Sequence, residues 1–353
     1  MSAVPAAPAA AARNLTPPQR VPLLMLGFVA LFAGVGAGLA RLGWPMPALL
    51  AGAAGIHGPL MVCGFFGVVI SLERAVAIGR LWAYVAPLAA GAGTLLALAG
   101  APVPAAWLGV LAAAMLLAGS LDVWHRQPAL FTFTMALGAA AWLAGALLWA
   151  GGAASIQVLP WWLAFLVLTI AGERLELSRL LPPSRSAVLL FAAILGVTVA
   201  ALAGSLRWHA GEVVFAGGLL ALALWLLRHD IARRTVRGRG LTRFIAVCLL
   251  FGHAWLAVGA AIALAAGGFA AGTGAYDAAL HAIVLGFVFS MVFGHAPVIF
   301  PAVLRVQVPY RRFFYGPLAL LQLSLLVRLA GDALGQADCV RAGGALNAAA
   351  LAA

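Results

Sequence analysis

The chain has 353 residues, of which 65% are apolar by type and 8% are charged, and its mean hydropathy is strongly positive. A soluble domain cannot bury that much apolar surface, whereas a lipid bilayer accepts it directly. All 21 basic residues are arginine, which excludes chemistry that needs a lysine amine, such as a retinal or pyridoxal Schiff base or a Walker phosphate loop.

In chain order, the sequence begins with an alanine- and proline-rich stretch, residues 1–20, which we expect to be a disordered cytoplasmic tail. Apolar stretches of about 20 residues, the length that a membrane span requires, then follow one another. They predict helices over 21–40, 48–71, 82–100, 104–123, 129–151, 158–175, 186–206, 212–228, 243–267, 276–299 and 313–330.

A twelfth helix is predicted from Val340 to the last residue, Ala353. This stretch is too short to cross a bilayer, which leaves open that the sequence given stops inside its last helix. The fold class is therefore predicted to be all-α: residues 21–353 form one polytopic membrane helical bundle of about 12 transmembrane helices.

The arginines are unevenly distributed between the two sides of this bundle. Only Arg41, Arg207, Arg328 and Arg341 fall on one side, and the others fall in the tail or in every second loop. Because basic residues accumulate in cytoplasmic loops, we expect the N-terminus in the cytoplasm and the chain in a bacterial inner membrane. The net charge of +12 is attributed to loops that touch anionic lipid, and not to nucleic acid.

Two predicted helices end alike at the inner face, the second in SLERAVAIGR and the sixth in AGERLELSRL. Local ion pairing and anchoring is the favoured interpretation of Glu73–Arg74 and of Glu173–Arg174. A four-helix repeat and convergent use of interfacial ion pairs both remain open as explanations of the likeness.

Four histidines lie within predicted spans, where ionisable groups are costly and usually functional. At about 1.5 Å per residue of helix, His57 and His281 fall in the outer half of the membrane and His253 near its middle, whereas His295 falls near the cytoplasmic surface. Two neutral imidazoles at similar depth on different helices are what a haem iron needs as axial ligands. We therefore predict His57, His281 and His253 as cofactor-binding residues, with His57 and His281 on the haem iron. The alternative for each is a buried histidine that is hydrogen-bonded to a neighbouring helix.

Two further features bear on the cofactor. The three cysteines are scattered and no C-x-x-C-H motif occurs, so the predicted haem is non-covalent and b-type. Small residues in the two histidine-bearing helices are expected to allow close approach of a flat macrocycle; they are Gly52, Gly55, Gly58, Gly64, Gly67, Gly286 and Gly294.

The segment HGPLMVCGFFG, which starts at His57, resembles the second-helix segment of the haem–copper oxidase catalytic subunit. The segment HAIVLGFVFSMVFGH, which starts at His281, resembles the NnrS family, whose members are polytopic haem- and copper-containing membrane proteins linked to nitric oxide stress. The twelve-helix plan of both families matches the predicted spans. The resemblance implies that His57 and His281 ligate haem.

The departures from these families limit what is carried over. Oxidases hold copper with histidines on their sixth and seventh helices, and the corresponding segments here, LPWWLAFLVLTIAG and AVLLFAAILGVTVAAL, contain none. Oxygen-reductase activity is therefore not expected. Copper has little support, because Pro59 stands where NnrS proteins commonly have a second histidine.

Three functions follow as hypotheses. The first is a haem-binding protein of NnrS type, in nitric oxide tolerance or in the handling of a redox ligand. The second is a secondary transporter that uses intramembrane histidines in a substrate or proton path. The third is an accessory subunit of a larger respiratory complex, with a redox partner.

Overall fold

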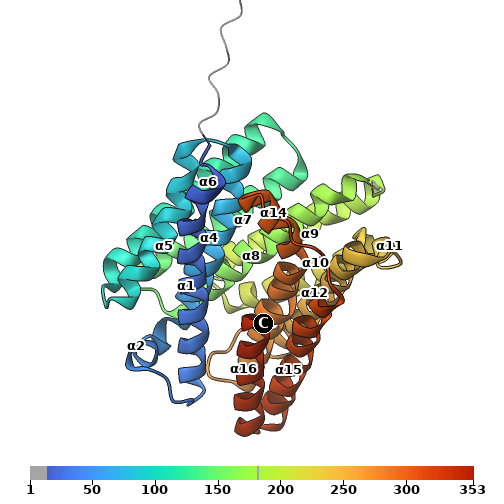
Figure 1. The fold of residues 1–353 in the computed structure, drawn as a ribbon. Helices are drawn as coiled ribbons and strands as arrows, with labels where there is room; N and C mark the ends of the chain where they lie inside the picture. The colour runs from blue at the N-terminus through green and yellow to red at the C-terminus, as the bar shows by residue number, and fades with distance from the viewer. Residues whose placement is uncertain (1–13, 181–182) are drawn as a thin grey trace, which may run out of the picture.

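The computed structural model describes residues 14–180 and 183–353, and every regular element within them is a helix. Eleven helices in this part of the chain are long and apolar enough to cross a membrane, and they pack side by side (Figure 1). This confirms the predicted all-α, polytopic membrane bundle. The spans are α1 (Pro17–Arg41), Ala54–Ile78, Leu81–Leu98 with α5 (Val85–Leu98), α6 (Pro102–Arg126), α7 (Leu130–Ala150), α8 (Ser155–Leu177), α9 (Arg185–Gly204), α10 (His209–His229), α12 (Gly240–Ala265), Gly274–Leu304, and Arg312–Leu334 with α15 (Tyr315–Leu334).

The first span begins earlier than predicted. Helix α1 starts at Pro17, so its first turn takes in residues that were assigned to the tail. Proline suits the first helical position, and the side chain of Gln19 accepts a hydrogen bond from the backbone N–H of Thr16 at 2.9 Å, which satisfies an otherwise free donor at the helix start. Residues 1–13 lie outside the described part of the chain.

The second span is not the single helix that was predicted over 48–71. The short helix α2 (Ala48–Gly52) ends before a 3₁₀ turn, η1 (Ala54–Ile56), and α3 (His57–Pro59) then leads into a π-helical segment, η2 (Leu60–Phe66). Helix α4 (Gly67–Ile78) completes the span. Glycines weaken helix around the break, and Pro59 removes a backbone donor there.

The tenth span has the same construction around its own histidine. Helix α13 (Gly274–His281) leads into a π-helical segment, η5 (Ala282–Phe289), and α14 (Ser290–Leu304) completes the span. Each π-helical segment thus begins close behind an intramembrane histidine. Such segments are rare and are found frequently at functional sites.

The last helix, α16 (Ala337–Ala352), has 16 residues and begins slightly earlier than predicted. It packs against α15 and α1 (Figure 1). The remaining short helix, α11 (Ala232–Thr235), lies between α10 and α12.

The four most buried spans in the bundle are the second, fifth, sixth and tenth. The fractions of their apolar windows that are buried are 67%, 61%, 78% and 56%. The second and tenth spans meet through aromatic rings, with Phe65 and Phe289 stacked at 5.7 Å between centroids. These central spans carry the groups described next.

Candidate functional site

A cavity of about 400 Å³ lies between α1, the second span, α8, the tenth span, α15 and α16. His57 and His281 both line it. The two spans run in the same direction through the bundle, and the stacked Phe65 and Phe289 each follow their histidine by the same number of residues. This register places the two imidazoles at matching depth.

The ring of His57 is oriented by helix α1. Its Nδ1 lies 2.6 Å from the backbone oxygen of Gly34. Because a carbonyl oxygen can only accept, Nδ1 must carry the proton, and Nε2 is left as the unprotonated nitrogen of a neutral ring. The ring also packs closely on Gly38, where an added Cβ would lie 2.8 Å from Cε1 of His57. Glycine at this position therefore makes room for the imidazole.

The ring of His281 is oriented from its own helix. Its Nδ1 lies 2.8 Å from the backbone oxygen of Asp277 and 3.2 Å from that residue's carboxylate Oδ1. Arg328 holds this carboxylate with two bonds, from Nε at 2.8 Å and from Nη2 at 3.0 Å. Nδ1 again faces only acceptors, so Nε2 is the free basic nitrogen here as well. No described residue hydrogen-bonds to Nε2 of either histidine.

One wall of the cavity is polar. Arg41, Arg328 and Asn347 line it, and the Asn347 side chain is nine-tenths buried or more, at 3% exposure. Its Nδ2 donates to the Ser324 hydroxyl at 2.7 Å, but its Oδ1 has no partner among the described residues. The unpaired Oδ1 is an acceptor and needs a hydrogen-bond donor, and the three side chains make this part of the lining polar.

These residues fit a haem. Two neutral imidazoles with free Nε2 atoms form the ligand set that low-spin haem iron takes. The Nδ1–carbonyl bonds are the outer contacts that fix such ligands. The cavity volume lies within the range of cofactor sites, about 300–1,000 Å³. For copper the structure offers no comparable set of ligands. Within residues 14–180 and 183–353, no group of three or more His, Cys, Asp or Glu side chains is placed to hold a metal ion.

Most of the glycines that were expected to admit a macrocycle serve helix packing instead. An added Cβ at Gly64 would meet Ala30 of α1, and one at Gly67 would meet Trp142 of α7. Gly286 and Gly294 face α12 in the same way. Of the predicted set, Gly55 and Gly58 line the cavity.

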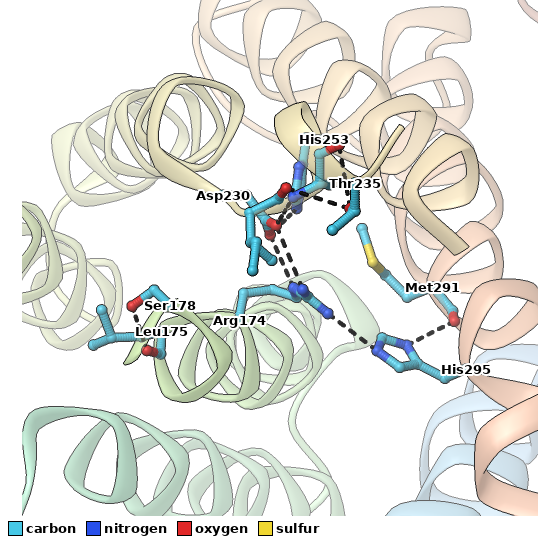
Figure 2. A network of polar contacts seen from close by, with 10 residues as sticks. Arg174, Leu175, Ser178, Asp230, Thr235, His253, Met291 and His295 are labelled. Atoms are coloured by element: carbon cyan, nitrogen blue, oxygen red, sulfur yellow. Dashed lines mark hydrogen bonds and ion pairs between the residues drawn. The ribbon is translucent and has the colours of Figure 1, made fainter. Parts of the chain in front are cut away.

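His253, predicted with the other two histidines, does not line this cavity. It lies in a separate buried network nearer the inner end of the tenth span (Figure 2). The His253 side chain is fully buried, and its Nε2 lies 3.6 Å from Oδ2 of Asp230. Neither of its ring nitrogens has a hydrogen-bond partner among the described residues. His253 therefore lies apart from the cavity that His57 and His281 line, because its ring faces Asp230, between α10 and α11.

Arg174 is the centre of this inner network (Figure 2). It donates to Asp230 from Nε at 2.8 Å and lies 3.3 Å from Nε2 of His295 through Nη1. The Arg174 and Asp230 side chains are 3% and 0% exposed. The expected local pairing of Arg174 with Glu173 is thus replaced by a pairing with Asp230 across the bundle. A buried guanidinium needs a carboxylate, and Glu173, the preceding residue, faces another side of the helix.

Several of these polar residues were not predicted as site residues from the sequence. Asp277 precedes His281 by one helical turn, and this spacing is a signal that both side chains share a helix face. Arg328 lies inside the predicted span 313–330, which marks it as unusual. Asp230 and Asn347 carry no such local signal.

Comparison with known proteins gives one match. A family model described as Domain of unknown function (DUF8744) matches residues 20–353. No curated protein and no solved structure matches the chain.

Proposed function

We propose that this chain, which belongs to the DUF8744 family, is a membrane protein that binds one non-covalent, b-type haem with His57 and His281 as its two axial ligands. The observation that carries the proposal is the hydrogen bonding of the two imidazole rings. Each has its Nδ1 fixed on a backbone carbonyl, at 2.6 Å for His57 and 2.8 Å for His281. Each ring therefore keeps a free Nε2, and both residues line the same cavity.

The polar wall supports the same ligand. Haem carries two propionate carboxylates, and guanidinium groups are the usual partners of carboxylates. Arg41 and Arg328 supply such groups at the cavity lining. The remaining lining is mainly apolar.

Two protein ligands on one iron favour electron transfer. The cofactor, when bound, supplies a one-electron couple, while the chain orients both imidazoles. We propose a bacterial inner-membrane location with the N-terminus in the cytoplasm, on the arginine distribution, and a redox partner as electron donor. Nitric oxide handling, implied by the resemblance to NnrS, would require one of the two axial positions to open.

The test is spectroscopic. The full chain, purified in detergent and supplied with haem, is compared with His57→Ala, His281→Ala and the matched control His125→Ala, which lies at the end of α6 and outside the cavity. We expect a Soret band in the wild type and the control, with a bis-imidazole low-spin spectrum that each of the other variants loses. A wild-type protein that folds and shows no Soret band would refute haem binding.

A secondary transporter is the second candidate, and one observation favours it. The tenth span carries ionisable groups at two levels, His281 with Asp277 above and His295 with Arg174 below, and discontinuous spans form the substrate and ion sites of many transporters. Solute uptake into vesicles by a colourless protein would establish this function in place of the first.

A further inference from the structure

We propose that the two imidazoles are unequal ligands: His281 is the permanent one, and His57 is the one that carbon monoxide or nitric oxide displaces. This inference rests on the proposed function, because it concerns the same cavity. It goes further by assigning the side on which a small gaseous ligand enters and the residue that admits it.

The His281 side is strengthened by charge. The carboxylate Oδ1 of Asp277 lies 3.2 Å from Nδ1 of His281, in addition to the backbone oxygen. A carboxylate beside the Nδ1–H bond draws the proton toward itself and raises the electron density on Nε2, which makes the ring a stronger donor to a metal. Arg328, whose side chain is 8% exposed, fixes both carboxylate oxygens, so the carboxylate cannot turn away.

The His57 side lacks this reinforcement. Its Nδ1 contacts the neutral carbonyl of Gly34, and no carboxylate of the described residues forms an ion pair with the ring. The donor strength of its Nε2 is therefore that of an ordinary imidazole.

The main chain around His57 is also less regular. His57 opens a three-residue helix between a 3₁₀ turn and a π-helical segment, whereas His281 closes an eight-residue helix that continues into its span. Added Cβ atoms at Gly52 and Gly55 would meet no atom within 4 Å. No neighbouring helix therefore packs closely on these two positions of the segment before His57.

The exchange balances without any further reactant. The bond between iron and Nε2 of His57 breaks, and a bond between iron and the incoming diatomic forms. The lone pair returns to a neutral imidazole that keeps its proton on Nδ1, so neither a proton nor an electron is needed. His281 stays bound throughout.

The first experiment compares two variants with the same chemical change, His57→Ala and His281→Ala, each as the full chain in detergent with haem and dithionite. We expect His57→Ala to retain haem and to bind carbon monoxide faster than the wild type, in which His57 must first leave. We expect His281→Ala to bind haem about 10- to 100-fold more weakly, a loss at least as large as that from an outer-contact change. The reverse order, or equal behaviour of the two variants, would overturn the proposal.

The second experiment removes the charge behind His281. Asp277→Asn is compared with Asp338→Asn, an exposed aspartate in the first turn of α16 that loses the same charge without touching His281. A weaker donor favours ferrous iron, so we expect Asp277→Asn to raise the midpoint potential by about 59 mV, equivalent to a tenfold change, while the control stays unchanged. A folded Asp277→Asn protein with the wild-type potential would contradict the inference.

These outcomes separate the two proposals. A wild type without a Soret band refutes haem binding itself, whereas a wild type with bis-imidazole haem and symmetric variants refutes only the inequality of the ligands. If Asp277→Asn fails to fold, the comparison of the two histidine variants still decides, because both keep the pair of Asp277 and Arg328.

Discussion

At the scale of single residues, two carboxylates that pair with arginine have opposite surroundings. Asp277 reaches the cavity and acts on His281, whereas Asp230 is fully enclosed and serves Arg174. Asp230 also accepts a hydrogen bond from the backbone N–H of Ala232 at 2.8 Å, which begins α11. One side chain thus neutralises a buried arginine and caps a helix.

We predict that Asp230→Ala strongly destabilises the fold. It leaves the Arg174 guanidinium buried without a carboxylate, and breaking one partner of a buried pair costs about 3–5 kcal/mol. The control is Glu176→Ala, which removes the partner of Arg179 from an exposed pair at 2.8 Å and should cost at most about 1 kcal/mol. Thermal unfolding of the two proteins in detergent measures the difference. Equal melting temperatures would show that Arg174 finds another partner.

At the scale of elements, the two π-helical segments do similar work. Each follows an intramembrane histidine, and each presents a phenylalanine to the other, Phe65 from η2 and Phe289 from η5. Such a segment carries an extra residue per turn relative to an α-helix, so it changes which side chains face inward. The segment therefore lets the histidine before it face the cavity while the residues after it face the core.

We predict that Gly286→Ala weakens the packing of the tenth span on α12. An added Cβ there would lie against Trp255 closer than two carbon atoms can approach, and overpacking of this kind costs about 1–3 kcal/mol. The matched control, Gly217→Ala in α10, has no atom within 4 Å of the added Cβ and should gain about 0.5–1 kcal/mol from the better helix former. Opposite shifts in melting temperature are expected, and a shift of the same sign in both would be evidence against this close approach.

At the scale of the whole molecule, orientation in the membrane follows from charge. The loops between α10 and α12 and between α14 and α15 carry many exposed arginines, and no acidic partner is found for them among the described side chains. The opposite end holds the cavity and the start of α16. A bundle with this asymmetry should insert with the arginine-rich loops in the cytoplasm.

We predict that a membrane-impermeant maleimide labels intact cells or right-side-out vesicles at Cys339, near the start of α16. Cys63 and Cys248 are buried, whereas Cys339 is partly accessible, so the wild-type chain already carries a single reporter. Cys339→Ser provides the background. Labelling found only in inside-out vesicles would place the N-terminus on the other side.

The sequence was sufficient for the spans and their order, since apolar length alone defines a membrane helix. The predicted boundaries fall within a few residues of the observed ones, except that α4 runs on to Ile78 and α14 to Leu304. That His57 and His281 lie at one cavity could also be predicted, because counting residues from the ends of their spans places both in the outer half of the bundle.

What depends on the rotation of helices about their axes could not be predicted. Depth alone placed His253 with the other two histidines, but the face on which its ring lies sends it to Asp230. The same limit hid Arg328 and Asn347, which reach the cavity only because α15 and α16 fold back against α1 and α13. Local composition was enough to predict that the chain lies in a membrane, where its spans are and how deep each ionisable group lies. Only the tertiary structure decided which groups meet, because that depends on how helices distant in sequence pack and turn against one another.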